Sequence, residues 1–446
     1  MNINFLLDVF KENKSECAIV WNDEKYKYSY LLKKIDEAKA FIEKNGIEPG
    51  DIVALEGDFS PVTIAFFLGL TDINAIVVPL TKNNSSKRKE LFKIAKVQHS
   101  IIIDKKDCYS YENYESTSQV AIYEIIRQRC HPGLVLFSSG TSGEPKAAVH
   151  DFKLLLKKFE TKRSSLITIN FLLFDHWGGL NTMLHILSNG GQLIATKERS
   201  AEKVCHLVEK YSVELLPSSP TFLNLLLLSN AYKDYDLSSL RVISYGTEPM
   251  PENTLLRLKS TFPDVKLLQT YGLIELGVLR SKSESNDSLW VKVGGEGYET
   301  RIIDGILQIK AESAMLGYLN AESPFTDDGW FITGDEVLEK DGFIKILGRK
   351  SEIINVGGEK VYPQEIENII LEMDDVIDVT VFPEDNAITG KIVCARVSLK
   401  DTKNKKESIQ QIKKFCRSKM KSFMVPVKIN ISKESQFNSR FKKKRA

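Results

Sequence analysis

The chain has 446 residues, of which 42% are hydrophobic, and its 61 basic and 59 acidic residues give a formal net charge of +2. A chain of this length is expected to form two or more domains. A nearly balanced charge provides no overall attraction for nucleic acid or for an anionic membrane, so any anion-binding site is expected to be local.

The amino-terminal segment, residues 1–14, lacks the basic start, long apolar stretch and small-residue cleavage site of a secretory signal. No later segment is apolar enough to span a bilayer. The cysteines lie far apart without a spacing suited to zinc, and they are expected to be reduced thiols in the core. They are Cys17, Cys108, Cys130, Cys205, Cys394 and Cys416. These features predict a cytoplasmic protein with no membrane span and no nucleic-acid partner.

The first third of the chain alternates helical and strand patterns. Residues 28–46 repeat apolar side chains at helical spacing and end at Gly46. Three apolar, β-branched runs follow, at 51–57, 75–80 and 99–104. This alternation predicts doubly wound α/β layers.

A segment rich in glycine and hydroxyl side chains, SSGTSGEPKAAVHD at 138–151, directly follows the apolar run 134–137. We expect the order strand, loop, helix, in which backbone N–H groups and hydroxyls surround an anion and Lys146 neutralises its charge. The segment differs from a Walker A loop, because Lys146 lies three positions after Gly143 and no serine or threonine follows it. Taken alone, the residues also fit a solvated Ser/Gly turn.

The carboxy-terminal third has a different pattern. Residues 291–312 alternate with period two and are broken by glycine pairs, which predicts antiparallel β structure. From about Arg349 the pattern predicts a small α+β domain of roughly a hundred residues. We therefore expect a large domain over 1–348 and a small one over 349–446. The expected elements of the small domain are a helix at 363–373, strands at 376–382 and 391–399, and a lysine-rich helix.

Five segments, in order, resemble the motifs of the adenylate-forming (AMP-binding) enzyme superfamily, closest in style to the acyl- and aryl-CoA synthetases. They are the phosphate loop at 138–147, the adenine segment at 245–249, the YGxTE motif at 269–277, the TGD motif at 329–335 and the hinge motif at 348–367. The resemblance covers nearly the whole chain. It implies an α/β fold with a large N-terminal domain of two doubly wound α/β subdomains plus a β-rich subdomain, and a small, mobile α+β C-terminal domain.

The resemblance also implies the residues that bind the nucleotide and the thiol cofactor. They are Ser138, Ser139, Gly140, Thr141, Ser142, Gly143, Lys146, Gly246, Thr247, Glu248, Pro249, Thr270, Tyr271, Gly272, Asp335, Arg349, Gly357 and Gly358. Asp335, in a tight turn after Gly334, is expected to accept the ribose hydroxyls, and Arg349 to donate to ribose or phosphate. The glycines Gly357 and Gly358 would let a pantetheine arm pass close to the backbone.

Glu275 takes the place of the family's metal-binding glutamate, so it is the implied Mg²⁺ ligand, since hard cations prefer oxygen. The alternative for Glu275 is a surface carboxylate at the start of a helix. Just before it, Ile274 replaces a threonine whose hydroxyl is expected to contact phosphate. Three explanations stay open: the loop hydroxyls and Thr270 replace that contact, turnover is low, or the natural substrate shifts the nucleotide slightly.

The family's catalytic lysine lies near the carboxyl terminus, where the resemblance implies Lys442. Phe441 stands in the place of the family's glycine, and the neighbouring Lys443 is the second candidate. A frayed basic tail is the alternative interpretation of these lysines.

Residues 171–193 are implied to line the acid pocket, with His176 as an aromatic or histidine gate. A histidine at this point can also be a neighbour of a helix cap. Asp175 is open to two interpretations. It could anchor a substrate ammonium, as in amino-acid-activating relatives, or it could cap the helix or pair with His176. Phe174 and Trp177 would suit an apolar or aromatic acyl group.

The implied function is that of an AMP-forming acid:thiol ligase. With ATP and Mg²⁺ it would activate a small carboxylic acid as an acyl adenylate and pass the acyl group to CoA or to the phosphopantetheine of an acyl carrier protein. Two alternatives stay open. One is a standalone amino-acid or acyl adenylation enzyme that loads a carrier protein. The other is a non-catalytic member of the fold that binds nucleotide.

Overall fold

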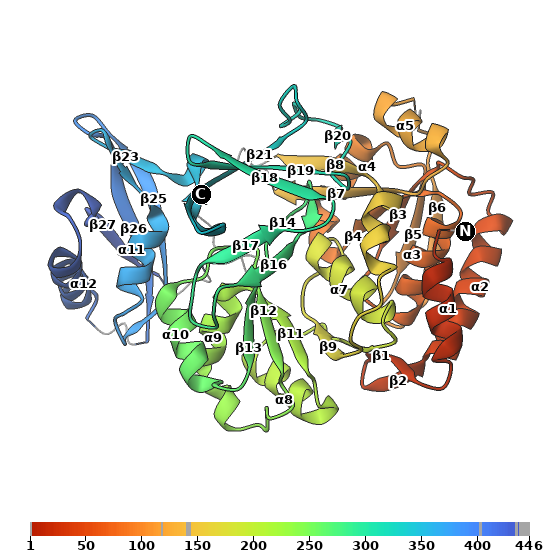
Figure 1. The fold of residues 1–446 in the computed structure, drawn as a ribbon, viewed down its shortest axis with the longest axis horizontal. Helices are drawn as coiled ribbons and strands as arrows, with labels where there is room; N and C mark the ends of the chain where they lie inside the picture. The colour runs from red at the N-terminus through yellow and green to blue at the C-terminus, as the bar shows by residue number, and fades with distance from the viewer. Residues whose placement is uncertain (1, 117–118, 140–143, 401–403, 433–435, 437–446) are drawn as a thin grey trace.

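The computed structural model describes residues 2–116, 119–139, 144–400, 404–432 and 436. Within them the chain forms two seven-stranded sheets, a six-stranded sheet, a two-stranded sheet and a five-stranded sheet. Figure 1 shows the helix-covered sheets of the first two thirds of the chain on one side and the carboxy-terminal sheet on the other. The fold is the mixed α/β architecture with a large N-terminal and a small C-terminal domain that the sequence predicts.

The first seven-stranded sheet is parallel except at its edge strand β2. Its strands, in spatial order, are β13 (Lys266–Gln269), β12 (Val242–Tyr245), β11 (Leu215–Ser218), β9 (Ile167–Asn170), β10 (Gln192–Ala195), β1 (Cys17–Trp21) and β2 (Glu24–Lys27). Helices α8 (Ala201–Tyr211), α9 (Pro220–Ser229) and α10 (Glu252–Thr261) share a hydrophobic core with it. Parallel strands joined by helices are the doubly wound arrangement expected from the alternating pattern.

The second seven-stranded sheet has a parallel centre and antiparallel edges. Its strands, in spatial order, are β20 (Gly317–Tyr318), β8 (Pro145–Asp151), β7 (Gly133–Ser139), β4 (Ile76–Leu80), β3 (Ile52–Glu56), β5 (His99–Ile103) and β6 (Tyr109–Asn113). Along β3, Val53 and Leu55 belong to one core and Ile52 and Ala54 to another, so both faces of the sheet are covered.

The core between the two sheets contains α1 (Asn4–Glu12), α2 (Tyr28–Lys44), α3 (Pro61–Asp72) and α7 (Trp177–Leu187). Every residue of α3 from Pro61 to Thr71 is buried, because the helix is apolar on all sides. Its start is fixed by Ser60, whose hydroxyl accepts from the Thr63 amide, and by proline at the first helical position.

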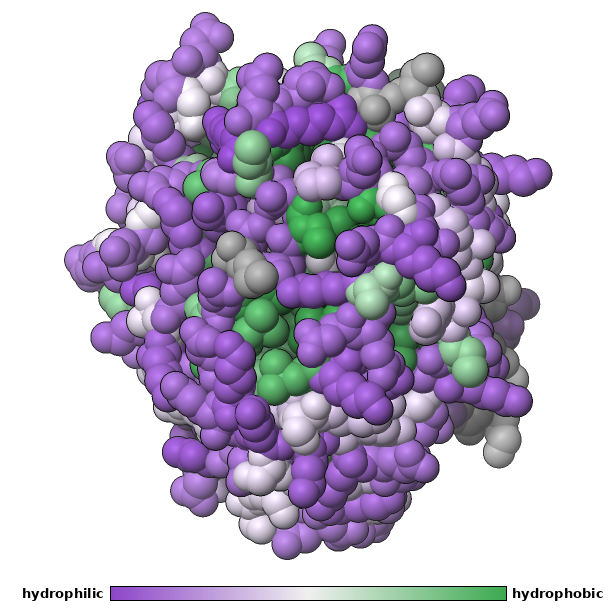
Figure 2. Space-filling model, turned by 90° about the vertical axis from the view of Figure 1, so that its right-hand side faces the viewer, coloured by the Kyte–Doolittle hydropathy of each residue, from purple (hydrophilic) through white to green (hydrophobic). Residues whose placement is uncertain are grey.

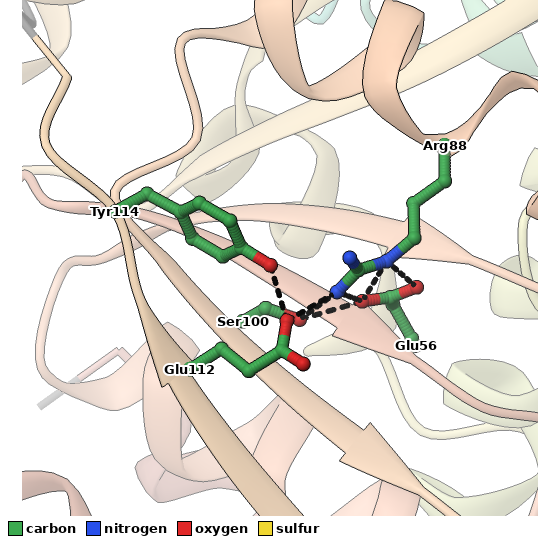
Figure 3. Close-up of polar contacts among 5 residues, drawn as sticks. All are labelled: Glu56, Arg88, Ser100, Glu112 and Tyr114. Carbon is green, nitrogen blue, oxygen red and sulfur yellow. Dashed lines mark hydrogen bonds and ion pairs between the residues drawn. The ribbon is translucent and has the colours of Figure 1, made fainter.

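The other face of the second sheet is covered by α4 (Arg88–Ala95) and α5 (Ala121–Arg129). Figure 3 shows how α4 is fixed: Arg88 donates to both carboxylate oxygens of Glu56 at 2.8–3.0 Å and to Glu112 at 2.7 Å. Ser100 donates to Glu56 at 2.6 Å, and Tyr114 donates to Glu112. The network ties the first residue of α4 to three strands of the sheet.

The segment after the glycine and hydroxyl loop forms strand β8, so the expected helix at this point is wrong. Strand β8 pairs antiparallel with β7, with Lys146 opposite Ser138. Pro145, Ala147, Ala148 and Val149 are buried between neighbouring elements, which favours a strand over a helix with one exposed side. No helix N-terminus therefore follows the loop directly, and the next helix, α6 (Phe152–Leu156), starts after the strand.

The six-stranded sheet is antiparallel, as the period-two pattern predicts. It contains β16 (Arg280–Ser283), β17 (Val291–Gly294), β22 (Phe343–Arg349), β21 (Phe331–Lys340), β19 (Ile306–Ala311) and β18 (Tyr298–Ile303). The carboxy-terminal sheet contains β24 (Glu359–Val361), β23 (Ile354–Val356), β26 (Gly390–Leu399), β25 (Val376–Asn386) and β27 (Lys428–Ile431). It shares a core with α11 (Pro363–Ile370) and α12 (Lys405–Lys419).

All six cysteines are free, as expected, but only Cys205, Cys394 and Cys416 are buried. Cys108 and Cys130 are exposed, so the prediction that the cysteines lie in the core is wrong for these two. None of the helices in the described part of the chain combines the length and the hydropathy needed to cross a bilayer. The face on the right-hand side of Figure 1 is mainly hydrophilic, with hydrophobic residues visible in its hollows (Figure 2).

Candidate active site

A cluster of polar side chains from separate motifs forms where the second seven-stranded sheet meets the six-stranded sheet. Its members are Lys146, Tyr271, Glu275, Tyr318, Asp335 and Arg349. Five of these were predicted from the sequence as site residues, and the sixth, Tyr318, was not. Each contacts another member by a hydrogen bond, an ion pair or a ring contact.

Asp335 is the most buried carboxylate of the cluster, with 6% of its surface exposed. Tyr271 donates to its Oδ2 at 2.6 Å, and Arg349 Nε lies 3.3 Å from its Oδ1. Asp335 does not follow a tight turn, as the sequence suggested, but lies within strand β21. Gly334 has a φ of +74°, and the pairing of β21 with β22 shifts register between Glu336 and Val337. The expected turn before Asp335 is therefore replaced by an irregularity at a glycine within the strand.

The charges of Asp335 and Arg349 depend on each other. Burial raises the pKa of Asp335, although the Arg349 charge and the Tyr271 hydrogen bond oppose the rise. Burial alone would lower the pKa of Arg349, but the charges of Asp335 and Glu275 outweigh it and raise that pKa. A buried carboxylate held in this way can accept donors from a ligand that brings hydroxyl groups.

Glu275 lies in a turn between β14 (Gly272–Leu273) and β15 (Gly277–Val278), not at the start of a helix. The Tyr318 hydroxyl donates to its Oε1 at 2.5 Å. Burial and the Glu275 charge together raise the pKa of Tyr318, which keeps the phenol protonated as the donor. Position 272, the first residue of β14, requires glycine, because a Cβ there would lie 2.9 Å from the Gly277 carbonyl oxygen.

Lys146 lies on strand β8, which follows the glycine and hydroxyl loop in the chain. Its Nζ lies 5.6 Å from the centre of the Tyr318 ring, and it takes part in no ion pair among the residues that the structure describes. Ser138 is half-buried on the paired strand, and Ser139 ends β7. The predicted phosphate contacts Gly140, Thr141, Ser142 and Gly143, the catalytic candidate Lys442 and its neighbour Lys443 lie outside the described residues.

The predicted adenine segment packs tightly against Thr270. A Cβ on Gly246 would lie 2.5 Å from Thr270 Oγ1 and 2.8 Å from its carbonyl oxygen, so only glycine fits there. Thr270 Oγ1 itself donates to the Tyr245 carbonyl at 3.0 Å, which places this hydroxyl in a backbone contact. Thr247 has a φ of +72°, and its buried Oγ1 has no hydrogen-bond partner among the described residues. Strained backbone and an unused buried donor are features of ligand-binding loops.

Glu248 and Pro249 connect the adenine segment to its surroundings. Glu248 Oε1 accepts from the Thr221 amide at 2.8 Å in the first turn of α9, and the Pro249 carbonyl accepts from Gln364 Nε2 of α11 at 2.9 Å. A groove lies between the two domains at this point. Its lining includes Pro220, Asn224, Glu248, Pro249, Gln364 and Glu367.

His176 is the N-cap of α7, and its Nδ1 accepts from the Gly178 amide at 3.0 Å. The cap is therefore histidine itself and not Asp175. Asp175 is 3% exposed, and its charge acts on Asp58 and on Arg199. Phe174 and Trp177, expected to suit the acyl group, belong to the hydrophobic core between the two large sheets.

Ile274, the departure from the family's threonine, packs partly buried against two hydrophobic cores. The replacement therefore exchanges a hydroxyl for apolar packing. His150 of β8 lies fully buried nearby, with the backbone of Ile274 and Ser313 beside its ring. Burial lowers the pKa of His150 to about 4, so this ring is neutral at physiological pH.

Gly357 and Gly358 form the turn between β23 and β24, with φ of +60° and +94°. Nothing lies within 4 Å of a Cβ added to either residue, so their conformation, and not crowding, requires glycine. Arg349 ends β22, and residues Lys350–Glu352 form a short 3-10 turn that leads into the carboxy-terminal sheet.

Two residues of the site were missed by the sequence reasoning: Tyr318 and Asn320. Asn320 accepts from the Ala147 amide at 3.0 Å and donates to the Pro145 carbonyl at 2.9 Å, on either side of Lys146. Tyr318 lies 43 positions from Glu275 in the chain. No local pattern marks such residues, because their contacts arise from the pairing of β20 with β8.

The cluster fits a metal ion that arrives with a nucleotide. Among the described residues no three histidine, cysteine, aspartate or glutamate side chains are grouped to hold an ion by themselves. Mg²⁺ usually keeps several water ligands and binds through one or two carboxylates plus substrate phosphates. Glu275, a half-buried carboxylate held by Tyr318, supplies one carboxylate of that kind.

Two family models match the chain. The AMP-binding enzyme model matches residues 81–304, and the model of the AMP-binding enzyme C-terminal domain matches residues 365–442. Among curated proteins, the chain is 24% identical to a 2-succinylbenzoate--CoA ligase of Listeria monocytogenes, covering 96% of this chain and 95% of that one. It is 28% identical to 4-coumarate--CoA ligase-like 9 of Arabidopsis thaliana, over 69% of this chain and 60% of that one.

Solved structures share the fold. An anthranilate CoA ligase in complex with anthranoyl-AMP superimposes with a TM-score of 0.81 at 17% identity, covering 98% of this chain and 95% of that one. ATP-bound MatB from Rhodopseudomonas palustris gives a TM-score of 0.78 at 21% identity, covering 99% and 97%. At these identities the likeness concerns the fold alone.

Proposed function

The chain belongs to the AMP-binding enzyme family, and from this premise we propose that it is an ATP-dependent acid:thiol ligase. It would activate a carboxylic acid as an acyl adenylate and transfer the acyl group to a thiol. The observation that supports this most directly is the buried Asp335 carboxylate, held by Tyr271 and Arg349 and close enough to Glu275 to feel its charge. The selectivity for the acid and for the thiol would then depend on the other residues that line the site.

Forming an adenylate brings a carboxylate against the α-phosphate of ATP, and these two anions repel each other. The site must therefore supply positive charge and oriented donors. We assign the ribose hydroxyls to Asp335, the phosphates to Lys146 and the loop 140–143, and the base to the segment Gly246–Pro249. Lys442 is the proposed lysine between nucleotide and carboxylate. Gln436, six positions before it, is 2% exposed and donates to Ser398 of the small domain at 2.7 Å.

We propose that Mg²⁺ accompanies the nucleotide and that Glu275 is its protein ligand. Bound there, the ion would neutralise phosphate charge. The role of Glu275 in that arrangement is to present one oxygen while Tyr318 engages the other. Lys146, which has no ion pair among the described residues, is left to meet the phosphates.

For the second step we propose CoA as the thiol, since the curated relatives are named CoA ligases. The Gly357 and Gly358 turn, with open space around both glycines, would admit the pantetheine arm. We place the division between the large and small domains at residues 348 and 349, where β22 ends and the short turn begins. A small domain that pivots there would expose this turn to the cleft.

The experiment is ATP–pyrophosphate exchange with the full-length protein and a panel of aliphatic, aromatic and amino acids. Exchange with at least one acid is expected, followed by thioester formation when CoA is added. Lys442→Ala should lower exchange by about 100-fold or more, and Lys443→Ala is the matched control that should stay close to wild type. Exchange without transfer to CoA, but with transfer to a carrier protein, would favour the carrier-loading enzyme. If no acid supports exchange while ATP still binds, the chain is a nucleotide-binding member of the fold without this activity.

A further inference from the structure

We propose that Tyr318 is a positioning residue that holds Glu275 in place and keeps it apart from Lys146. The inference rests on the proposed function, because it concerns the two side chains assigned to Mg²⁺ and to phosphate. It adds a residue that none of the five sequence motifs contains. Its basis is that Tyr318 contacts both side chains, Glu275 through its hydroxyl and Lys146 through its ring.

Tyr318 and its neighbours in the chain contact Glu275 directly. The Tyr318 hydroxyl donates to Oε1 at 2.5 Å, and the Met315 amide donates to the Glu275 backbone carbonyl at 2.7 Å. Side chain and backbone of residue 275 are therefore both held by the segment 315–318. A charge-assisted hydrogen bond of this length restricts the rotation of the carboxylate.

The same segment is also hydrogen-bonded to strand β8, which follows the phosphate loop. The Leu316 amide donates to the Val149 carbonyl at 2.7 Å, and the Leu319 amide donates to the Ala147 carbonyl at 3.0 Å. Asn320 holds the backbone on both sides of Lys146. Glu275 and the backbone on both sides of Lys146 are thus hydrogen-bonded to one short segment, residues 315–320, which sets their separation.

The Tyr318 ring also contacts Lys146. The Lys146 ammonium lies 5.6 Å from the centre of the Tyr318 ring, a cation–π contact that attracts the cation without neutralising it. A lysine and a glutamate free to approach would form an ion pair, and each would be lost to the nucleotide. In the inferred arrangement the contact with the ring holds Lys146 away from Glu275, so both groups stay available for phosphate and metal.

Two substitutions separate the two roles. Tyr318→Phe keeps the ring and removes the donor, so Glu275 loses its orientation while Lys146 keeps its neighbour. Tyr318→Leu removes both, and Lys146 can then reach Glu275. Tyr28→Phe is the matched control, because it removes a buried hydroxyl with a 2.6 Å hydrogen bond, to the Gly191 carbonyl in the core between the large sheets.

The test is ATP binding by calorimetry with and without Mg²⁺, using the full-length protein. Wild type should bind ATP more tightly with Mg²⁺, and Tyr318→Phe should reduce this gain by about tenfold while leaving metal-free binding unchanged. Tyr318→Leu should weaken metal-free binding as well. Tyr28→Phe should show the wild-type gain. A full gain in Tyr318→Phe, or a wild type without any gain, would overturn the inference.

If Tyr318→Phe does not fold, Glu275→Gln provides the second route, because it should remove the same Mg²⁺ gain and leave Lys146 unaffected. When both single variants fold, their double variant should lose no more than either one, as expected for residues that act as a unit. The binding readout also separates this inference from the proposed ligase function. An absence of pyrophosphate exchange would refute the ligase, whereas an unchanged Mg²⁺ gain would refute only the role of Tyr318.

Discussion

Tyr271 donates a 2.6 Å hydrogen bond to Asp335 in the interior, and it lies 64 positions earlier in the chain, between strands β13 and β14. The bond opposes the effect of burial, which raises the pKa of Asp335. Tyr271→Phe removes it, so the pKa of Asp335 should rise further. As pH falls, the carboxylate should then be protonated earlier in the variant than in wild type.

The measurement for Tyr271→Phe is the KM for ATP between pH 5 and 8. We expect the KM for ATP to rise at acidic pH in both proteins. In the variant the rise should begin at a higher pH, so that at a given acidic pH its KM is about tenfold higher than that of wild type. At high pH, where Asp335 is ionised in both, the two curves should converge toward a smaller difference. Parallel curves without displacement would contradict the role given to this bond.

His150 predicts a loss of stability in mild acid. Its pKa is lowered by burial from 6.5 to about 4, so below pH 6.5 the unfolded chain binds a proton that the folded protein does not. The free energy of unfolding should therefore fall as pH drops from about 6.5 to about 4, by roughly 3 kcal/mol for this residue. Above pH 6.5 the residue should contribute no pH dependence.

Urea denaturation across pH 4.5–7.5 tests this prediction. His150→Leu should flatten the slope below pH 6.5, although it also changes packing at neutral pH. His185→Leu is the matched variant, because burial also lowers the pKa of His185 to about 4. Each single variant should remove part of the slope and the double variant more. A wild-type slope in His150→Leu would contradict the assignment.

Arg88 predicts a stability effect without an effect on the site. Arg88→Met leaves Glu56, whose side chain is only 18% exposed, without its bidentate partner. We expect a loss of about 2 kcal/mol, since a partly buried carboxylate is left unpaired. The double variant with Glu56→Gln should recover part of this loss. Chemical denaturation measures the effect, and an unchanged KM for ATP in the folded variant is the internal control.

The sequence predicted the parts of the fold that local patterns encode. Helix α2, strands β3, β4 and β5, the antiparallel β subdomain and the elements of the small domain all lie where periodicity places them. It missed β8, because a strand that follows a glycine loop is distinguished from a helix only by its pairing with β7. Periodicity describes one segment, whereas pairing depends on a partner elsewhere in the chain.

The same distinction applies to the site. The motifs identified Glu275, Asp335, Arg349 and Lys146 as residue types with chemical roles, and the structure brings these four together. They could not indicate Tyr318, whose function follows from sheet pairing. They also could not show that His176 would cap its own helix, since a cap is defined by backbone dihedrals that composition leaves open.

Gln364 gives the last prediction, which concerns the contact between the two domains. Its Nε2 donates to the Pro249 carbonyl of the adenine segment, and Asn224 and Asn253 of the large domain donate to the Ile377 and Leu371 carbonyls. All three bonds use a side-chain amide on one domain and a backbone carbonyl on the other. Such bonds are weak singly, about 1 kcal/mol each, and can be broken and remade as a domain moves.

Gln364→Ala should therefore destabilise the arrangement seen here by about fivefold in population, because among the three bonds just described it removes the one that ends on the adenine segment. If this arrangement serves adenylation, pyrophosphate exchange should fall by that factor while the transfer of a preformed adenylate to CoA stays unchanged or becomes faster. Asn253→Ala is the matched control, since its bond to the Leu371 carbonyl crosses the same boundary away from the nucleotide segment. Asn253→Ala should slow exchange, because it lowers the population of this arrangement, and it should leave the KM for ATP at its wild-type value. Gln364→Ala should raise the KM for ATP. Equal effects of both variants on the KM would mean that Gln364 acts only as an interface residue and not through Pro249.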